Sequence, residues 1–127
     1  MEFEHFALNV QSPASIAEWY VENLGMKIVF QDPKPPFMTF LADETDRVVV
    51  ELYSNPAAKI PDYANQHHLE FHFAFKTKEA ESLKSKLMTE GCSFVEEVKK
   101  EDGSHLIMLR DPWGLALQLC QRATPLV

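Results

Sequence analysis

The sequence contains an internal repeat, and this repeat constrains the fold more than any other feature of the chain. The segment His-Phe-Ala-Leu at residues 5–8 returns as His-Phe-Ala-Phe at residues 72–75, 67 residues further on. Glu51 and Gln118 each follow a short apolar run, and they too are 67 residues apart. A duplicated unit with polar residues at matching positions predicts two similar modules in a two-fold arrangement.

The composition is that of an ordinary globular domain. Of 127 residues, 46% are hydrophobic and 24% are charged, which predicts a well-formed core. The formal net charge of −7 argues against nucleic acid as a partner, and no apolar run is long enough to span a membrane. Cys92 and Cys120 form no short-spaced motif, and the N-terminus lacks a signal-peptide pattern. We therefore expect reduced thiols in a cytoplasmic protein.

The first half of the chain predicts the element order β-α-β-β-β. Residues 3–10 alternate as a strand does. Ser12 and Pro13 predict a helix that starts with a hydroxyl cap, and Gly25 predicts its end. The remaining strands are predicted at 27–31, 37–41 and 47–53.

The second half repeats this order after a segment rich in turn formers. A strand is predicted at 69–76, followed by a helix capped by Thr77 and ended by Gly91. Further strands are predicted at 93–99, 105–110 and 115–121. The chain is thus predicted to be a single domain, 1–127, that comprises module one (1–53), a linker (54–67) and module two (68–123).

The predicted fold class is α+β, with the two modules forming a curved eight-stranded open barrel, or cup, and the helices outside it. His5 and His72 fall on the face of their strands opposite the helix-packing residues. Glu51 and Gln118 alternate with large apolar neighbours and so point away from the helices as well. These four side chains are expected to line the cup.

The same four side chains predict a metal centre. Two imidazoles and a carboxylate are a common ligand set for divalent transition metals, and a carboxamide oxygen is a weaker, neutral fourth ligand. We therefore predict His5, Glu51, His72 and Gln118 as metal ligands. One carboxylate against a doubly charged cation leaves a positive site, which stabilises an enolate or another oxyanion. Glu51 is the only carboxylate of the set and is the predicted catalytic base.

Other polar residues are expected to be ordinary surface or core. His67 and His68 end the linker, and His105 follows an Asp-Gly hairpin turn, so all three are expected at the surface. Cys120 lies two residues past Gln118 and is expected to be a small buried residue rather than a nucleophile.

The chain resembles the vicinal oxygen chelate superfamily, which includes glyoxalase I, bleomycin- and fosfomycin-resistance proteins, methylmalonyl-CoA epimerase and extradiol dioxygenases. The resemblance covers nearly the whole chain. Its landmarks are the two His-Phe-Ala strands, the Trp-Tyr and Leu-Gly-Met motifs within 19–26, and the Asp-Pro-Trp-Gly turn at 111–114. The resemblance implies paired β-α-β-β-β modules and a divalent metal, often Ni, Zn, Mn, Fe or Co.

The ligand pattern is most similar to that of glyoxalase I. This implies a metalloenzyme similar to lactoylglutathione lyase: a lyase or isomerase that acts α to a carbonyl through a metal-stabilised enediolate. Gln118 stands where bacterial glyoxalase I has a fourth-ligand Glu, and Asn9 stands where that family has an Arg that holds glutathione. Asn55 matches a glutathione-contacting position. Asn9 and Asn55 are therefore candidate substrate-binding residues, and the substrate is open.

Two alternatives stay open beside this function. One is a non-enzymatic protein that sequesters a drug or another small ligand, as bleomycin-resistance proteins do without a metal. The other is an Fe(II)-dependent extradiol dioxygenase, because exchange of the two modules turns His5, His72 and Glu51 into the two-His, one-carboxylate triad. The expected partner is a small molecule in every case. Open sheet edges and the family resemblance favour a homodimer, with ligands from one chain or from two swapped chains.

Overall fold

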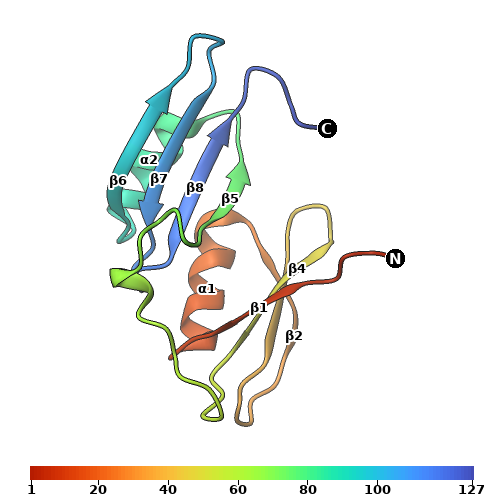
Figure 1. Cartoon of the computed structure of the whole chain (residues 1–127). Helices are drawn as coiled ribbons and strands as arrows, with labels where there is room; N and C mark the ends of the chain where they lie inside the picture. Colours follow the sequence, from red (N-terminus) through yellow and green to blue (C-terminus); the bar gives the residue numbers. More distant parts are fainter. The chain divides into compact units, whose positions relative to one another are not determined.

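The computed structural model describes residues Met1–Val127, which form two compact units, Met1–Pro61 and Asp62–Val127. Each unit contains one α-helix and one four-stranded sheet with both parallel and antiparallel pairs (Figure 1). The element order is β-α-β-β-β in both units. The predicted α+β fold class, with two β-α-β-β-β modules, is confirmed.

The elements lie close to their predicted positions. The first unit consists of β1 (Phe6–Asn9), α1 (Pro13–Leu24), β2 (Lys27–Gln31), β3 (Thr39–Ala42) and β4 (Val48–Tyr53). The second unit consists of the short 3₁₀ helix η1 (Tyr63–Asn65), β5 (Phe73–Lys76), α2 (Ala80–Thr89), β6 (Ser93–Lys99), β7 (His105–Arg110) and β8 (Ala116–Gln121).

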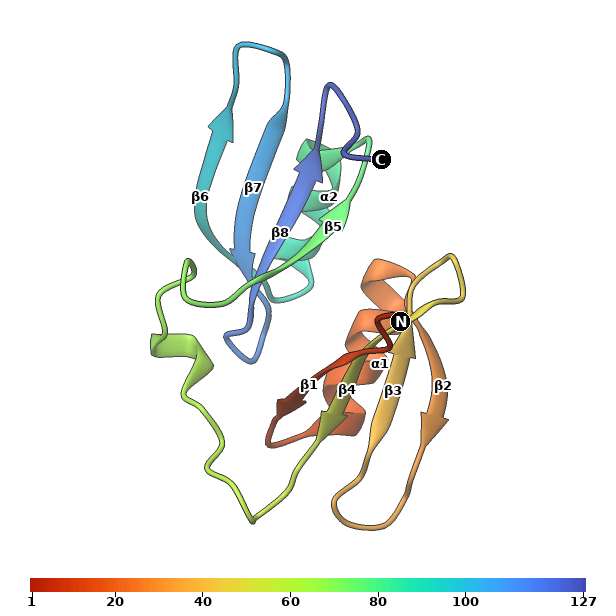
Figure 2. The ribbon, with the colours of Figure 1, turned by 45° about the vertical axis from the view of Figure 1, so that its right-hand side comes forward.

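The two sheets share one strand order, and their parallel strand pairs share one register. The orders are β1-β4-β3-β2 and β5-β8-β7-β6, so the first strand of each unit pairs in parallel with its last strand (Figure 2). Ala7 lies opposite Glu51 in the first parallel pair, and Ala74 lies opposite Gln118 in the second. The 67-residue repeat of the sequence is therefore also the spacing between equivalent positions of the two ladders.

The edge strands β2 and β6, called the outer strands, each contain a β-bulge at the equivalent position. In β2, Val29 is the extra residue between Ile28 and Phe30, which lie opposite neighbouring residues of β3. In β6, Val95 is the extra residue between Phe94 and Glu96. A bulge places residues two positions apart on opposite faces of the sheet.

The two faces of each sheet have different surroundings. The helix face packs against the helix of the same unit, and the opposite face is called the site face. Residues directly opposite each other on paired strands share a face. The site face of the first sheet therefore carries Ala7, Glu51, Phe40 and Phe30, and that of the second carries Ala74, Gln118, Met108 and Glu96.

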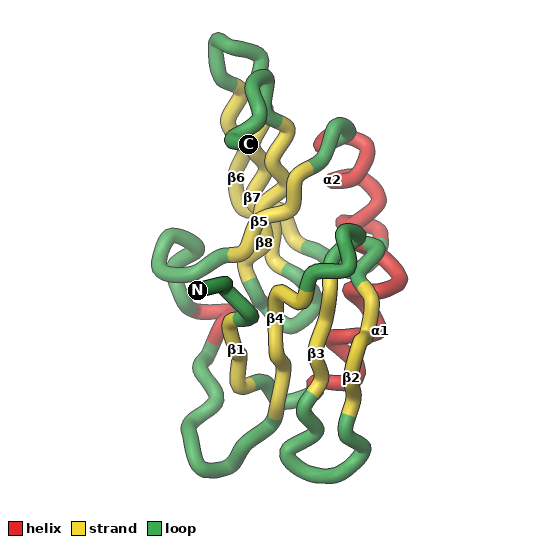
Figure 3. Tube along the Cα trace, turned by 90° about the vertical axis from the view of Figure 1, so that its right-hand side faces the viewer, coloured by secondary structure: helices red, strands yellow, loops and turns green.

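Each helix lies along one face of its own sheet (Figure 3). In the first unit, Ile16 and Tyr20 of α1 are buried, as is Leu41 of β3. In the second unit, Leu87 of α2 and Leu117 of β8 are fully buried. Removing these apolar surfaces from water stabilises each helix on its sheet. No helix has the length and hydropathy needed to cross a lipid bilayer.

Neither helix begins with the predicted hydroxyl cap. Ser12 precedes α1, but its side chain makes no capping hydrogen bond. The helix α2 begins at Ala80, three residues after Thr77, whose Oγ1 accepts the N–H of Glu79 at 3.0 Å. The N–H of Ala80 donates to Oε1 of Gln121 at 3.0 Å. A side chain from β8 thus satisfies one of the first free amides of α2.

The last residues of the predicted linker are bound to the second unit. Arg110 donates from Nη1 to the carbonyls of Tyr63 and Gly114, both at 3.0 Å, and from Nη2 to the carbonyl of Gln66 at 2.5 Å. Gly114 has φ +91°, and a Cβ at this position would lie 2.5 Å from the Cβ of Ala64. This close approach requires glycine at position 114.

The contact between Gly114 and Ala64 predicts a difference between two glycine substitutions. Gly103 has a similar φ of +93°, but a Cβ added there would have no other atom within 4 Å. Gly114→Ala and Gly103→Ala should therefore share the backbone strain, while only Gly114→Ala adds a steric clash. We expect Gly114→Ala to lose about 1–3 kcal/mol more unfolding free energy than Gly103→Ala in urea denaturation. Equal losses would contradict the close packing of Gly114 against Ala64.

Candidate functional site

Two of the predicted ligands, His5 and Glu51, meet in the first unit. His5 immediately precedes β1, and Glu51 lies in the middle of β4, so the parallel pairing of these strands brings them together. His5 Nε2 lies 3.2 Å from Glu51 Oε2, and their side chains are 26% and 13% exposed. The pair is therefore partly screened from solvent and still accessible.

The other nitrogen of His5 also faces a carboxylate. Nδ1 lies 2.9 Å from Oε1 of Glu4. A carboxylate only accepts hydrogen bonds, and a neutral imidazole has a single N–H. If Nδ1 donates to Glu4, the lone pair of Nε2 is directed at the oxygen of Glu51. A proton or another cation between Nε2 and Oε2 is needed to make that contact favourable.

The other two predicted ligands, His72 and Gln118, lie in the second unit, and each has a defined partner. His72 Nδ1 lies 2.9 Å from the backbone carbonyl of His68, which can only accept, so Nδ1 donates. In neutral His72 the lone pair is then on Nε2.

The amide of Gln118 is oriented by a thiol on the same strand. Cys120 Sγ donates to Gln118 Oε1 at 3.2 Å. Burial raises the pKa of Cys120, so the sulfur keeps its proton and serves as the donor. Cys120 is 4% exposed, which confirms the prediction that it is a buried residue.

Each unit therefore supplies one imidazole and one side-chain oxygen. In both imidazoles Nδ1 lies within hydrogen-bond distance of an oxygen, and the Nε2 of His5 faces Glu51. This division of the two ring nitrogens is typical of histidines that bind metals. The assignment of all four residues as ligands of one ion stays a prediction.

An aromatic surface continues from the His5–Glu51 pair across the site face of the first sheet. The edge of the Phe40 ring contacts the His5 ring at 5.2 Å between centroids, and Phe30 contacts Phe40 in a similar way at 6.2 Å. Phe30 is 51% exposed. The sequence alone did not place Phe30 on this face because the bulge at Val29 carries no sequence signature.

The two candidate substrate-binding residues, Asn9 and Asn55, contact each other. Asn9 Nδ2 donates to the carbonyls of Asn55 and Ala58 at 3.1 and 3.0 Å, and Asn9 Oδ1 accepts the N–H of Asn55 at 2.8 Å. Asn55 Oδ1 accepts the N–H of Ala57 at 3.0 Å. Both residues thus shape the loop that follows β4. A contact with substrate stays a prediction.

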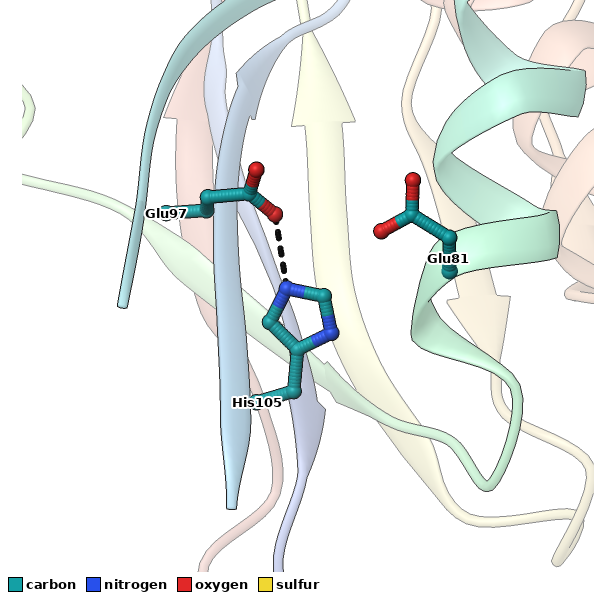
Figure 4. A group of neighbouring side chains, drawn as sticks. All are labelled: Glu81, Glu97 and His105. Carbon is teal, nitrogen blue, oxygen red and sulfur yellow. Dashed lines mark hydrogen bonds and ion pairs between the residues drawn. The ribbon is translucent and has the colours of Figure 1, made fainter. Parts of the chain in front are cut away.

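A second group of potential metal ligands lies on the helix face of the second sheet and was not predicted. Glu81 of α2, Glu97 of β6 and His105 of β7 place their ligand atoms within 4.8 Å of one another (Figure 4). His105 Nε2 lies 2.6 Å from Glu97 Oε2. The expectation that His105 lies on the hairpin surface is wrong, because it is only 9% exposed.

A lysine already supplies a positive charge to this group. Lys84 Nζ lies 3.3 Å from Glu97 Oε1 and 3.8 Å from Glu81 Oε1. The hydrogen bond from His105, with a further contribution from Lys84, lowers the pKa of Glu97 below its ordinary value of 4.5. The group can therefore hold a cation only in competition with Lys84, and as it stands it links α2 to the sheet.

The lowered pKa of Glu97 predicts a pH dependence of stability. The unfolded chain binds the Glu97 proton at higher pH than the folded chain, so the stabilisation is present above pH 4.5 and is lost as the pH falls below it. We expect the difference in unfolding free energy between wild type and Glu97→Gln to shrink from about pH 6 to about pH 3. Glu81→Gln is the control, since Glu81 has only the longer ion pair with Lys84. A pH-independent difference for Glu97→Gln would refute this role.

Removal of the buried Asn9 amide is expected to lower the free energy of unfolding. Asn9 is 8% exposed, and Asn9→Ala leaves the N–H of Asn55 and two carbonyls without these partners. We expect a loss of about 1–3 kcal/mol in unfolding free energy, measured by urea denaturation. Asn65, whose exposed amide bonds to Asp62, is the control, and Asn65→Ala should lie within about 0.5 kcal/mol of wild type. Similar losses in both variants would show that the Asn9 bonds add nothing special.

Comparisons with known proteins identify the family of this chain. Solved structures of the same fold include an integron cassette protein from the mobile metagenome of a Halifax Harbour sewage outfall (22% identity, TM-score 0.71, 95% of this chain and 98% of that chain). Others are lactoylglutathione lyase from Agrobacterium tumefaciens (17%, 0.66, 94% and 92%) and the antibiotic-binding protein TnmS3 from Streptomyces sp. CB03234 (15%, 0.69, 94% and 94%). No curated protein matches the sequence. The family description "Glyoxalase/Bleomycin resistance protein/Dioxygenase superfamily" matches residues 2–119, and the chain belongs to this superfamily.

Proposed function

We propose that this protein is a metal-dependent lyase or isomerase, similar to glyoxalase, that moves a proton at a carbon next to a carbonyl group. The observation that carries the proposal is the His5–Glu51 pair. Its two facing atoms lie 3.2 Å apart, and the remaining nitrogen of His5 is engaged by Glu4.

The spacing of this pair fits two ligands of one divalent cation. Two ligand atoms about 2.1 Å from an ion, at an angle between octahedral and tetrahedral, lie about 3.0–3.4 Å apart. The separation of 3.2 Å between His5 Nε2 and Glu51 Oε2 falls within that range. The engaged Nδ1 of His5 supports the same reading, because a ligating histidine usually donates its other N–H to an oxygen.

We propose His72 and Gln118 as the remaining ligands, from the same chain or from a second one. Their positions in β5–β8 are equivalent by register to those of His5 and Glu51 in β1–β4. A bound divalent cation such as Ni, Zn, Mn, Fe or Co supplies positive charge that stabilises an oxyanion of the substrate. The homodimer and the cytoplasmic location stay predictions.

The protein's own groups perform the proton transfer in this proposal. The carboxylate of Glu51 accepts the proton from the carbon next to the carbonyl and returns it to the neighbouring carbon, so no oxidant or reductant is required. His5 contacts Glu51 through Nε2 and is itself held by Glu4 at Nδ1. The aromatic row of Phe40 and Phe30 offers an apolar wall for the substrate body and keeps water from the reacting carbon.

A second candidate function is the sequestration of an apolar small molecule without chemistry. The half-exposed Phe30, in edge contact with Phe40, favours it, because aromatic side chains on an open sheet face suit a flat or apolar ligand. TnmS3, which has the same fold, is an antibiotic-binding protein. Sequestration requires neither a metal nor a base at position 51.

The proposed function predicts both metal uptake and a specific effect of Glu51→Gln. The wild type should retain a divalent metal in elemental analysis and lose it to a chelator. Glu51→Gln keeps an oxygen ligand but removes the base, so turnover of an α-hydroxycarbonyl substrate or of a methylglyoxal–thiol adduct should fall about 10²–10⁴-fold. Glu81→Gln, on the helix face of the other unit, should leave turnover unchanged.

The outcomes separate the candidate functions. Full activity of Glu51→Gln on a substrate that wild type converts would show that Glu51 is not the base. A wild type that takes up none of the five metals would refute the metalloenzyme. In that case, binding of apolar ligands that is weakened by Phe30→Ala would support sequestration.

A further inference from the structure

We propose that His68 and Glu96 form a brace that positions His72, and that Glu96 is thereby a positioning residue of the metal centre. The consequence for metal binding rests on the proposed function, whereas the brace itself does not. His68 was expected at the surface of the linker, but its side chain is only 11% exposed. This burial is explained by its partners.

The ring of His68 is held from two sides. Its Nε2 lies 2.8 Å from Oε1 of Glu96, and its face stacks on the ring of His67, with centroids 4.4 Å apart and planes at 24°. His67 is fixed in turn, because its Nδ1 accepts the N–H of Leu69 at 3.1 Å and its carbonyl accepts the N–H of Glu70 at 2.9 Å. The tight turn before β5 is thus tied to the outer strand β6.

The bulge at Val95 makes this tie possible. Glu96 lies opposite Met108, which lies opposite Gln118, so the Glu96 carboxylate shares the site face with the Gln118 amide. Without the extra residue, Glu96 would share the face of Phe94, whose ring contacts Lys84 of α2. The carboxylate reaches His68 from β6, two strands away from the β8 strand of Gln118.

The brace acts on His72 through the backbone. Glu96 holds the ring of His68, and the backbone carbonyl of the same His68 accepts the Nδ1 hydrogen of His72 at 2.9 Å. Fixing this carbonyl fixes the tautomer of His72, with the hydrogen on Nδ1 and the lone pair on Nε2. The orientation of the predicted ligand therefore depends on a carboxylate that does not touch it.

The neighbouring residue on β6 provides a matched control. Glu97 also binds a histidine, His105, at 2.6 Å, but on the helix face. Glu96→Ala and Glu97→Ala therefore each remove one Glu–His pair from the same strand, and only the first pair leads to His72. Glu96→Gln retains an oxygen acceptor for His68 and should rescue the effect. Glu96 has a 55% exposed side chain, so its replacement should leave the fold intact.

The brace can be tested in the metal-free protein by long-range ¹H–¹⁵N spectra of the imidazoles at about pH 8, which is above the ordinary pKa of a free imidazole. His72→Gln identifies the His72 signals. Wild type, Glu96→Gln and Glu97→Ala should show His72 with a protonated Nδ1 and a bare Nε2, whereas Glu96→Ala should show a mixture of tautomers. An unchanged single tautomer in Glu96→Ala, or an equal change in Glu97→Ala, overturns the brace.

A Zn²⁺ titration of wild type, Glu96→Ala and Glu96→Gln tests the consequence for the metal centre. Glu96→Ala should bind Zn²⁺ about 10–100-fold more weakly than wild type, and Glu96→Gln should bind like wild type. Equal Zn²⁺ affinity in Glu96→Ala overturns the positioning role even where the proposed function holds. If wild type binds no Zn²⁺, the metal centre is refuted. If Glu96→Ala then still shows a mixture of His72 tautomers where wild type shows one, the brace is supported on its own.

Discussion

The parallel pairing of the first and last strands is the contact on which each unit depends. The strand that opens a unit lies beside the strand that closes it, so residues about 45 positions apart in the chain become neighbours. The helix and the antiparallel strands of each unit lie between these two strands in the chain. The parallel pairing also brings His5 to Glu51, and it sets the register in which Gln118 occupies the position equivalent to Glu51.

The two units use one backbone plan for different surfaces. In the first unit, the charged residue is central, at Glu51, and the outer strand contributes the aromatic ring of Phe30. In the second unit, the central residue is the neutral Gln118, and the outer strand contributes the carboxylate of Glu96. The parallel strand pairs of the two units therefore share one register. The carboxylate lies on the central strand in the first unit and on the outer strand in the second.

The sequence predicted the order and approximate bounds of all eight strands and both α-helices, because each half-buried strand alternates and each helix has an apolar stripe. The errors share one physical cause: a partner distant in sequence. The acceptor for the first amide of α2 is Gln121, so the local Thr77 signal did not mark the helix start. His68 and His105 pair with Glu96 and Glu97, which no local pattern links to them. The four proposed ligands were visible only because the repeat marked them.

The bulge in the outer strand changes which of its side chains lie on each face of the sheet. In the second sheet the inner strands β7 and β8 pair without a register shift, and a slip there would turn core residues such as Leu117 outward. An edge strand has a partner on one side only, so gaining or losing a single residue re-aims its side chains without disturbing the core. Insertions and deletions at positions 29 and 95 can thus change the side chains at the edge of the site face while the rest of the sheet stays intact.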